Sequence, residues 1–439
     1  MNYRRAKILC IIFGFISLLF FTSDFQLIDI EKTAIIVALG VDFENDEYEI
    51  TAQIAVPQAG DFSAGNSDAV ITSKGKTVYE GIEKISQQSG WYPELSFCNI
   101  IVFGKTVVNK NAVALADYFL SSNKFQNSAI LAACEGSAKD VLKSTTSLDF
   151  ISSFALQKIL LRNIDRANSV MVTDIREFCS NNRSVSRFCY LPLIKEIETD
   201  DKQKGSGDSG GNGGGGGDSS FVENGGVISA GNFGKNQQII KKTNTGSGGS
   251  AGGGSAAGKN TEAGSGEKCV FDAGESILFS NGKPVCKFNR EQTLCYNMLY
   301  EQVHESFVDL KYTDGETEKE VLIAVLDNKP NVSLKVEKGG LKAKIFLELT
   351  CRKEELDENQ SIKGLEKQKI LTDKELFALQ QKTVNAINSL ISLSRENDCD
   401  LFRFKENLYR YNPQYFPALK DLVVNSLQIE IEVKCVNYN

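Results

Sequence analysis

Residues 34–56 (AIIVALGVDFENDEYEITAQIAV) combine two patterns of hydrophobic and polar positions. Positions 34–41 carry no charge and are rich in β-branched side chains, which predicts a strand buried on both faces. From Tyr48 to Val56 apolar and polar residues alternate, as is typical of a half-exposed strand. The polar residues 44–47 between them predict a turn. The region is therefore expected to form a β-hairpin at the start of a domain.

Helical and extended patterns alternate along the chain after this hairpin. Apolar residues at helical spacing predict a helix over 76–89, and the apolar run in 96–104 predicts a buried strand. The patterns of 111–122 and 127–136 favour a further helix and a further strand, and 145–195 favours a helix, a connection and a closing strand. Such alternation indicates an α/β or α+β organisation.

The second half of the chain carries stronger local signals. Asn281-Gly282 predicts a tight hairpin within 276–288. Asn289 followed by Gln292 predicts a capping box at the start of a helix. The other predicted elements are paired strands over 332–351, a long helix over 371–395 and an alternating strand over 427–436. Helices packed on a sheet are therefore expected in this half as well.

A glycine-rich segment separates the two halves. Residues 205–266 carry 22 of the 37 glycines and few large apolar side chains, which predicts a flexible linker rather than a folded core. The expected fold class is α+β: a signal anchor, then three mixed helix and sheet domains with a disordered glycine-rich insertion. The predicted boundaries are 1–27 (signal peptide or signal anchor), 28–140 (N-terminal α/β domain), 141–200 (middle region or second domain), 201–268 (linker) and 269–439 (C-terminal α+β domain).

The N-terminus has the layout of an export signal. Arg4, Arg5 and Lys7 precede an uninterrupted apolar stretch at 8–21, so the chain after it is expected on the extracytoplasmic side. The stretch is shorter than most membrane spans, but neither an Ala-x-Ala cleavage site nor a lipobox cysteine follows it. An uncleaved signal anchor is favoured over a cleaved signal peptide, and no lipidation is expected. The predicted membrane-anchor residues are Ile8, Leu9, Ile11, Ile12, Phe13, Phe15, Ile16, Leu18, Leu19, Phe20 and Phe21.

Charge and motif content argue against several classes of function. The formal net charge of -7 disfavours a nucleic-acid binder, which needs a basic surface. His304 is the only histidine, and it is interpreted as a solvated residue at the end of a helix rather than a catalyst. Phosphate-binding loops, dinucleotide fingerprints and nucleophile elbows are missing from the sequence. No catalytic residue, cofactor or metal is therefore expected.

The cysteines leave two interpretations open. Eleven cysteines in an exported chain suggest disulfides, yet no C-x-x-C occurs. Cys98, Cys295 and Cys435 fall at apolar positions of predicted strands or helices, which suits small hydrophobic core residues equally well.

The order of several motifs resembles the Ger(x)C family, the C subunits of bacterial spore germinant receptors. After the export signal come EKTAIIVALGVD, YEITAQIAVP, GKTVYEGIEKIS and IIVFGKTVV. In the second half, SILFSNGKPVCKFNREQT resembles the strand-turn-strand-helix element of that family. DLFRFKENLYRYNPQYFPALKD, followed by an alternating strand, is similar to the C-terminal end of the family. The chain departs from the family in lacking the lipobox cysteine, so its apolar segment is expected to anchor it alone.

The resemblance implies a non-enzymatic, membrane-associated subunit of a spore germinant receptor. Its expected partners are polytopic membrane subunits, and its expected place is the extracytoplasmic face of the inner spore membrane. The alternative is an exported envelope protein that binds a small ligand or a cell-wall fragment. A third hypothesis is a hydrolase using two carboxylates, with acidic residues such as Glu94, Asp117 and Glu135 as candidates, and solvated surface charges explain these better.

Overall fold

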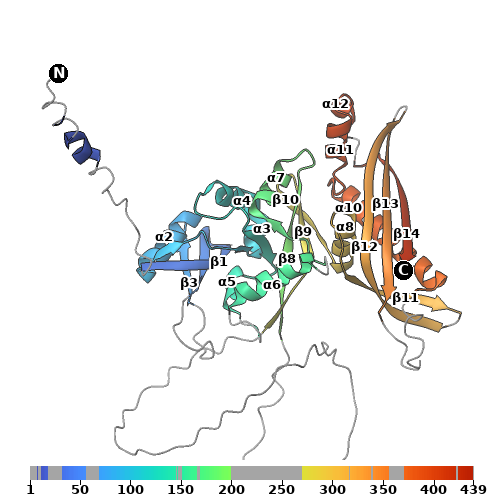
Figure 1. Cartoon of the computed structure of the whole chain (residues 1–439), viewed down its shortest axis with the longest axis horizontal. Helices are drawn as coiled ribbons and strands as arrows, with labels where there is room; N and C mark the ends of the chain where they lie inside the picture. The colour runs from blue at the N-terminus through green and yellow to red at the C-terminus, as the bar shows by residue number, and fades with distance from the viewer. Residues whose placement is uncertain are drawn as a thin grey trace, which may run out of the picture. The chain divides into compact units, whose positions relative to one another are not determined.

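The computed structural model describes residues 7, 11–17, 32–55, 69–144, 146, 151–165, 169–198, 269–315, 317–337, 340–354, 370–421 and 424–438. These residues form two sheets and the helices that pack against them (Figure 1). The predicted linker, 201–268, lies outside the described residues. So do residues 1–6, 8–10 and 18–31 of the predicted signal region and its continuation.

The first sheet has ten strands, of which eight follow the order β10-β9-β8-β6-β5-β1-β2-β3, while β4 pairs with β1 and β7 with β6. The strands are β1 (Thr33–Glu44), β2 (Glu47–Ala55), β3 (Ala69–Gly75), β4 (Tyr92–Glu94), β5 (Ile100–Phe103), β6 (Ile130–Cys134), β7 (Thr173–Asp174), β8 (Phe188–Glu198), β9 (Cys269–Ser280) and β10 (Lys283–Phe288). Pairing is parallel for β1–β5, β5–β6 and β6–β8 and antiparallel towards both ends of the sheet.

Helices cover both faces of this sheet, as Figure 1 shows for its upper and lower sides. One face carries α2 (Val78–Ser89), α3 (Lys105–Lys110), α4 (Ala112–Ser121) and α7 (Ile175–Arg183). The other carries α5 (Ala138–Lys143) and α6 (Ser152–Asp165). Each face has its own apolar core, so the central strands are buried on both sides.

The opening stretch forms the predicted hairpin, with β1 and β2 paired in antiparallel register. Asn45 and Asp46 take positive φ angles of 52° and 61°, which short polar side chains tolerate in a tight turn. β1 is buried on both faces as expected. The expectation that β2 is half-exposed is wrong, because Thr51 and Gln53 on its polar face are fully buried beneath α5 and α6.

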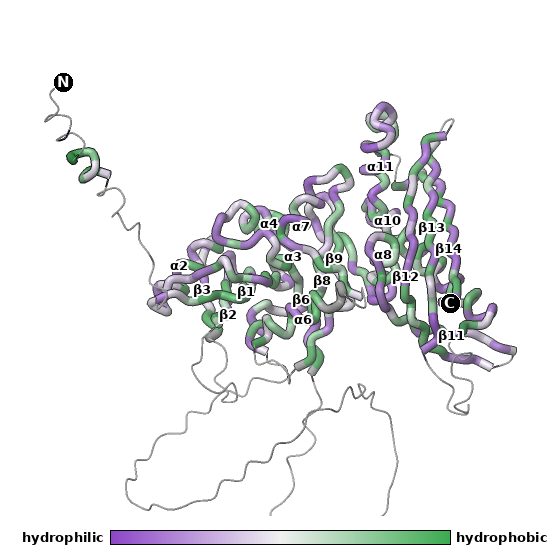
Figure 2. The backbone as a smooth tube through the Cα atoms, in the orientation of Figure 1, coloured by the Kyte–Doolittle hydropathy of each residue, from purple (hydrophilic) through white to green (hydrophobic). Residues whose placement is uncertain are grey.

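The second sheet has four strands in the order β11-β12-β13-β14. Its elements are β11 (Ser306–Asp314), β12 (Thr317–Glu337), β13 (Gly340–Lys353) and β14 (Gln428–Asn437), with the helices α8 (Arg290–Tyr300), α10 (Asp373–Glu396), α11 (Phe404–Tyr411) and α12 (Phe416–Leu419). Buried and accessible positions alternate along β13, and Figure 2 shows hydrophobic and hydrophilic residues interspersed along the strands of this sheet. One face packs on α8 and α10, as the alternation predicts.

Several local predictions for this half are confirmed. Asn281 and Gly282 form the hairpin turn with φ angles of 50° and 78°. Asn289 and Gln292 make the reciprocal capping box at the start of α8. The long helix and the closing strand are present as α10 and β14. Together with the first sheet, these elements confirm the α+β fold class.

Strands that follow the glycine-rich segment belong to the first sheet. β9 pairs with β8, and β10 pairs with β9, so hydrogen bonding continues across the predicted linker. The described residues within 1–199 and 266–439 belong to one compact unit. Ser186 donates to the Asp400 carboxylate at 2.6 Å, and the Asn297 amide donates to the Val170 carbonyl at 3.1 Å. The division into domains stays a prediction.

Candidate functional site

The predicted membrane-anchor residues are only partly described. Ile11, Ile12, Phe13, Phe15 and Ile16 lie in a short helical stretch, residues 11–17, and all five are exposed. The remaining predicted anchor residues, Ile8, Leu9, Leu18, Leu19, Phe20 and Phe21, lie outside the described residues. Within the described part of the chain, every helix is either too short or too polar to cross a membrane.

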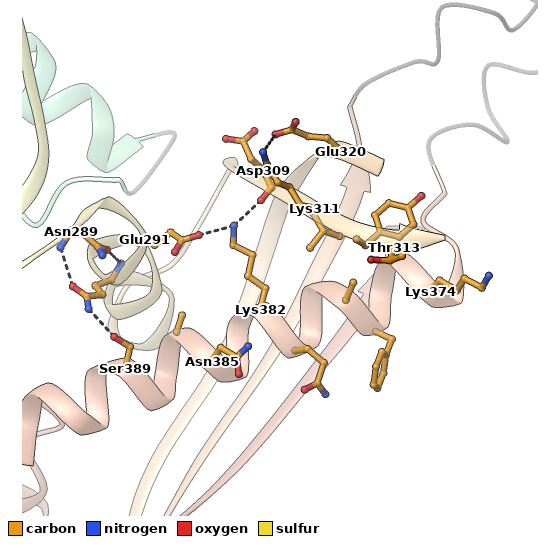
Figure 3. A pocket seen from close by; sticks show the side chains of 17 residues that line it. Asn289, Glu291, Asp309, Lys311, Thr313, Glu320, Lys374, Lys382, Asn385 and Ser389 are labelled. Carbon is orange, nitrogen blue, oxygen red and sulfur yellow. Dashed lines mark hydrogen bonds and ion pairs between the residues drawn. The ribbon is translucent and has the colours of Figure 1, made fainter. Parts of the chain in front are cut away.

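A groove of about 910 Å³ lies between α8, α10 and β11 (Figure 3). It is lined by polar and charged side chains together with a few apolar ones: Asn289, Glu291, Gln292, Asp309, Leu310, Lys311, Tyr312, Thr313, Glu320, Lys374, Phe377, Ala378, Gln381, Lys382, Asn385, Ala386 and Ser389. Phe377 on α10 is 61% exposed there. The groove is the main candidate for a binding surface in the described C-terminal part.

Charges in the groove largely neutralise one another. Figure 3 shows the Lys382 ammonium between Glu291 and β11, at 2.6 Å from the Glu291 carboxylate and 2.7 Å from the Asp309 carbonyl oxygen. Lys311 pairs with Glu320 at 3.6 Å. Two lysines of the groove are therefore held in place by carboxylates of neighbouring elements.

The edge of β11 forms one wall of the groove. Five successive residues, 309–313, line it, so the strand presents its backbone edge as well as its side chains. Among the described strands, β11 pairs only with β12. The Asp309 carbonyl accepts from Lys382 and so points away from β12. In an antiparallel pair every second residue directs its N–H and C=O away from the partner strand, so the backbone groups of Lys311 and Thr313 also point to this open edge. An open strand edge of this kind can accept a further extended chain.

A buried carboxylate fixes α10 beside this edge. Glu375 accepts hydrogen bonds from Tyr312 on β11 at 3.0 Å and from Lys353 on β13 at 3.1 Å, and it closes a capping box with Thr372. Burial alone raises the pKa of Glu375, but the hydrogen bonds from Thr372 and Lys353 outweigh it and hold the pKa below its ordinary value. The ionised side chain thus ties the start of α10 to the sheet.

Two further buried carboxylates cap helices. Asp42 on β1 accepts hydrogen bonds from the Ser137 hydroxyl and from the Ala138 and Lys139 amides at the start of α5, at 2.9 to 3.0 Å. Asp400 accepts from the Phe404 and Lys405 amides in the same way at α11. Burial raises the pKa of both carboxyls above the ordinary value. Their partners identify them as structural groups.

The three carboxylates considered for hydrolysis bond to separate partners. Glu94 accepts from the Ser96 amide, Asp117 pairs with Arg183 at 2.6 Å, and Glu135 contacts Lys195 and Lys287. His304 is exposed and lies beyond Tyr300, where α8 ends, so it is not the helix-terminal residue that was expected. In the described residues no cluster of metal-binding side chains occurs.

The nine cysteines whose side chains the structure describes are free thiols. Seven are buried: Cys98, Cys134, Cys179, Cys189, Cys295, Cys351 and Cys399, while Cys286 and Cys435 are half-buried. Burial raises the pKa of Cys98 and of Cys295 to about 12, so these thiols stay protonated and packed. For these nine residues the structure favours the core interpretation over disulfides.

Sequence reasoning did not identify the groove. Its wall residues come from three separate segments, and each segment taken singly is an ordinary amphipathic helix or strand. The capping box at Asn289 and the predicted helix over 371–395 located two walls, but no pattern indicated that β11 would be the edge strand beside them.

Comparison with known proteins identifies the family. A spore germination protein N-terminal domain model matches residues 26–196, and a model of the spore germination B3/GerAC-like C-terminal domain matches residues 275–436. The chain belongs to the GerAC-like spore germination family. Both models describe domains of spore germination proteins.

Individual relatives are similar over different lengths. Spore germination protein B3 of Bacillus subtilis (strain 168) is 31% identical over 118 residues, which are 26% of this chain and 31% of the relative. The match thus spans about a third of that relative's length. The crystal structure of the GerBC protein is 14% identical, with a TM-score of 0.46, and the match covers 91% of this chain and 97% of that one.

Proposed function

We propose that this chain is a non-enzymatic, membrane-associated subunit of a spore germinant receptor, which supports nutrient-triggered germination by assembling with integral membrane subunits. The observation that carries the proposal is the presence, in one chain and in order, of the N-terminal and C-terminal domains of the GerAC-like family. The apolar stretch 8–21 with its basic flank supports anchoring, with the folded parts on the extracytoplasmic face.

The groove between α10 and β11 is the surface proposed to contact a receptor partner. Its strand edge offers backbone hydrogen bonds, and the exposed Phe377 offers an apolar contact beside them. Aromatic side chains flanked by polar groups are typical of protein interfaces. Three lysines of the groove wall are held by carboxylates, Lys382 by Glu291, Lys311 by Glu320 and Lys374 by Asp314, and such an ordered polar surface supports an assembly role.

Co-purification tests the proposal directly. The native full-length chain carries a C-terminal tag, membranes of sporulating cells are extracted with a mild detergent, and the co-purifying proteins are identified. Recovery of polytopic receptor subunits is expected. Recovery of the tagged chain alone, together with unchanged germination of spores that lack the gene under every nutrient tested, would refute the assembly role.

A second function has one observation in its favour. The groove volume lies in the range of small-molecule sites, which suits the alternative of an exported binding protein for a small ligand or cell-wall fragment. A ligand held there would raise the melting temperature of the full-length protein as its concentration exceeds Kd. Phe377→Ala should abolish that rise, while Phe307→Ala on β11, outside the lining residues, should preserve it.

A further inference from the structure

Three exposed aromatic side chains lie on the connection between α2 and β5. Trp91, Tyr92 and Phe97, called the aromatic rim below, are 47%, 54% and 53% exposed. Trp91 is the only tryptophan in the sequence. Single exposed apolar residues are common on proteins, but three large exposed aromatic rings within seven residues of the chain are a concentration that a partner would be expected to cover.

The rim is held outward by a rigid backbone. Gly90, with φ 73°, ends α2, and the Trp91 amide donates to the Ser89 hydroxyl at 3.2 Å. Tyr92 begins β4, which is hydrogen-bonded to β1. Beyond it, the Ser96 amide donates to the Glu94 carboxylate at 3.0 Å. Because the connection is already ordered, contact with a partner would cost little conformational entropy.

The same strand pairing places the rim where the chain enters the fold. Tyr92 lies opposite Thr33, the first residue of β1, on a parallel neighbouring strand. Neighbouring strands are about 4.8 Å apart. The apolar stretch ends at Phe21, and the connecting residues 22–32 can span at most about 40 Å. A membrane that holds the apolar stretch therefore lies within reach of the rim.

We propose that the aromatic rim rests in the headgroup region of the lipid bilayer that holds the N-terminal apolar stretch. The proposal rests on the proposed function, which supplies the anchor. Tryptophan and tyrosine favour this region, since the ring is apolar while its N–H or O–H stays hydrated. The exposed Lys32 precedes Thr33 and can approach the lipid phosphates, whereas the nearby Glu94 carboxylate already accepts a hydrogen bond from the Ser96 amide. The contact would fix how the first sheet faces the membrane.

The single tryptophan makes the test direct. The full-length protein is reconstituted into vesicles of phosphatidylcholine and phosphatidylglycerol, with and without bromine on the acyl chains of the phosphatidylcholine. Trp91 emission should shift to shorter wavelength and fall about two-fold with brominated lipid, as expected for a ring at the interface. Both effects should persist in high salt, because they arise from the ring rather than from screened charges. Emission typical of water and unquenched by bromine would overturn the proposal.

A second variant controls for proximity to lipid in general. In the protein carrying Trp91→Phe and Phe377→Trp, the reporter moves to the exposed position on α10. This reporter should remain unquenched under the same conditions. Equal quenching at both positions would show non-specific lipid contact and would also overturn the proposal.

The outcomes separate this proposal from the proposed function. If the vesicle-bound chain leaves Trp91 unquenched but still co-purifies with integral subunits, the lipid contact is refuted and the assembly role stands. A Trp91 emission shift that occurs only in the purified complex would also refute the contact with lipid, and it would indicate a protein partner at the rim. Quenching without co-purification, together with unchanged germination of spores that lack the gene, would support the rim and refute the assembly role.

In spores, the rate of germination should depend on the aromatic character of the rim. Trp91→Ser with Tyr92→Ser should slow nutrient-triggered germination at unchanged protein level, while Trp91→Tyr should preserve it, because tyrosine also favours the interface. A rate unchanged by the serine pair would contradict the proposal.

Discussion

The two sheets of this protein bury their strands in different ways. The first sheet is covered by helices on both faces and has an apolar core on each. The second packs one face on α8 and α10, while charged pairs such as Lys344 with Glu432 lie at the surface of its strands. A polar residue on a strand therefore has a different environment in each sheet. In the first sheet it is buried and must form hydrogen bonds inside the protein, whereas in the second it can face solvent.

The largest expected effect compares one residue type in both sheets. Phe103 on β5 is fully buried, and Phe103→Ala should lower the free energy of unfolding by about 3–5 kcal/mol through lost burial and an unfilled cavity. Phe307 on β11 is 48% exposed, so Phe307→Ala serves as the matched control and should change the free energy of unfolding little. Urea unfolding followed by circular dichroism measures both. Equal losses would mean that the outer face of β11 is covered.

A buried polar side chain gives the next effect. Gln53 donates to the Leu142 carbonyl and to Ser152, and it accepts from the Ser153 amide at 3.0 Å. Gln53→Ala should cost about 1–3 kcal/mol, because it leaves buried donors and acceptors without partners. Lys335→Ala at an exposed position of β12 is the control and should leave the urea midpoint unchanged. A neutral Gln53→Ala would show that water reaches this face.

The pH dependence should separate the buried carboxylates of the two sheets. Asp42 has a pKa raised above 3.8 by burial, so the folded state holds its proton more tightly and the contribution of this group weakens as pH rises above 3.8. Glu375 has a pKa lowered from 4.5, so its contribution is complete above pH 4.5 and is lost as pH falls through the folded value.

Two isosteric variants measure these opposite trends. As pH falls below 4.5, the melting temperature of the wild type should approach that of Glu375→Gln. As pH falls further towards 3.8, the melting temperature of the wild type should rise relative to that of Asp42→Asn. Melting curves between about pH 3.5 and pH 7 provide the comparison. Differences that do not vary with pH would contradict both assignments.

The success of sequence reasoning differed between the sheets for a physical reason. In the second, the alternation of the strands and the Asn289 capping box of α8 are local signals, and local contacts satisfy them. The Asn281-Gly282 turn is a local signal of the same kind within the first sheet. In the first, the alternation of β2 suggested an exposed face, but α6 arrives from a hundred positions later and buries Gln53. The pattern of one strand shows which of its residues are polar. It does not show whether distant residues will bury them and supply their hydrogen bonds.

The groove and the rim show the same limit at the surface. The residues of the groove become neighbours only because α10 returns to lie beside β11. Tyr92 gains its position from pairing with a strand that begins at Thr33, and Trp91 precedes it directly. Composition could show that the chain has a single tryptophan. It could not show that this residue lies where the apolar stretch leads into the fold.

The smallest expected effect on stability is at the groove itself. Lys382 bridges Glu291 and the Asp309 carbonyl, but Glu291 is largely exposed, and such pairs contribute about 0–1 kcal/mol. Lys382→Met should thus scarcely change unfolding, while it alters the strand edge that we propose as a partner contact. Lys344→Met, which removes an exposed pair with Glu432 on the second sheet, is the matched control.

Co-purification with the integral subunits should fall with Lys382→Met and stay unchanged with Lys344→Met, at equal protein level. Because the two variants remove comparable surface charges from the same sheet and its helix, a difference between them would locate the contact at the groove. If both variants recover the subunits equally well, the groove is not the assembly surface, and the contact must lie elsewhere on the chain.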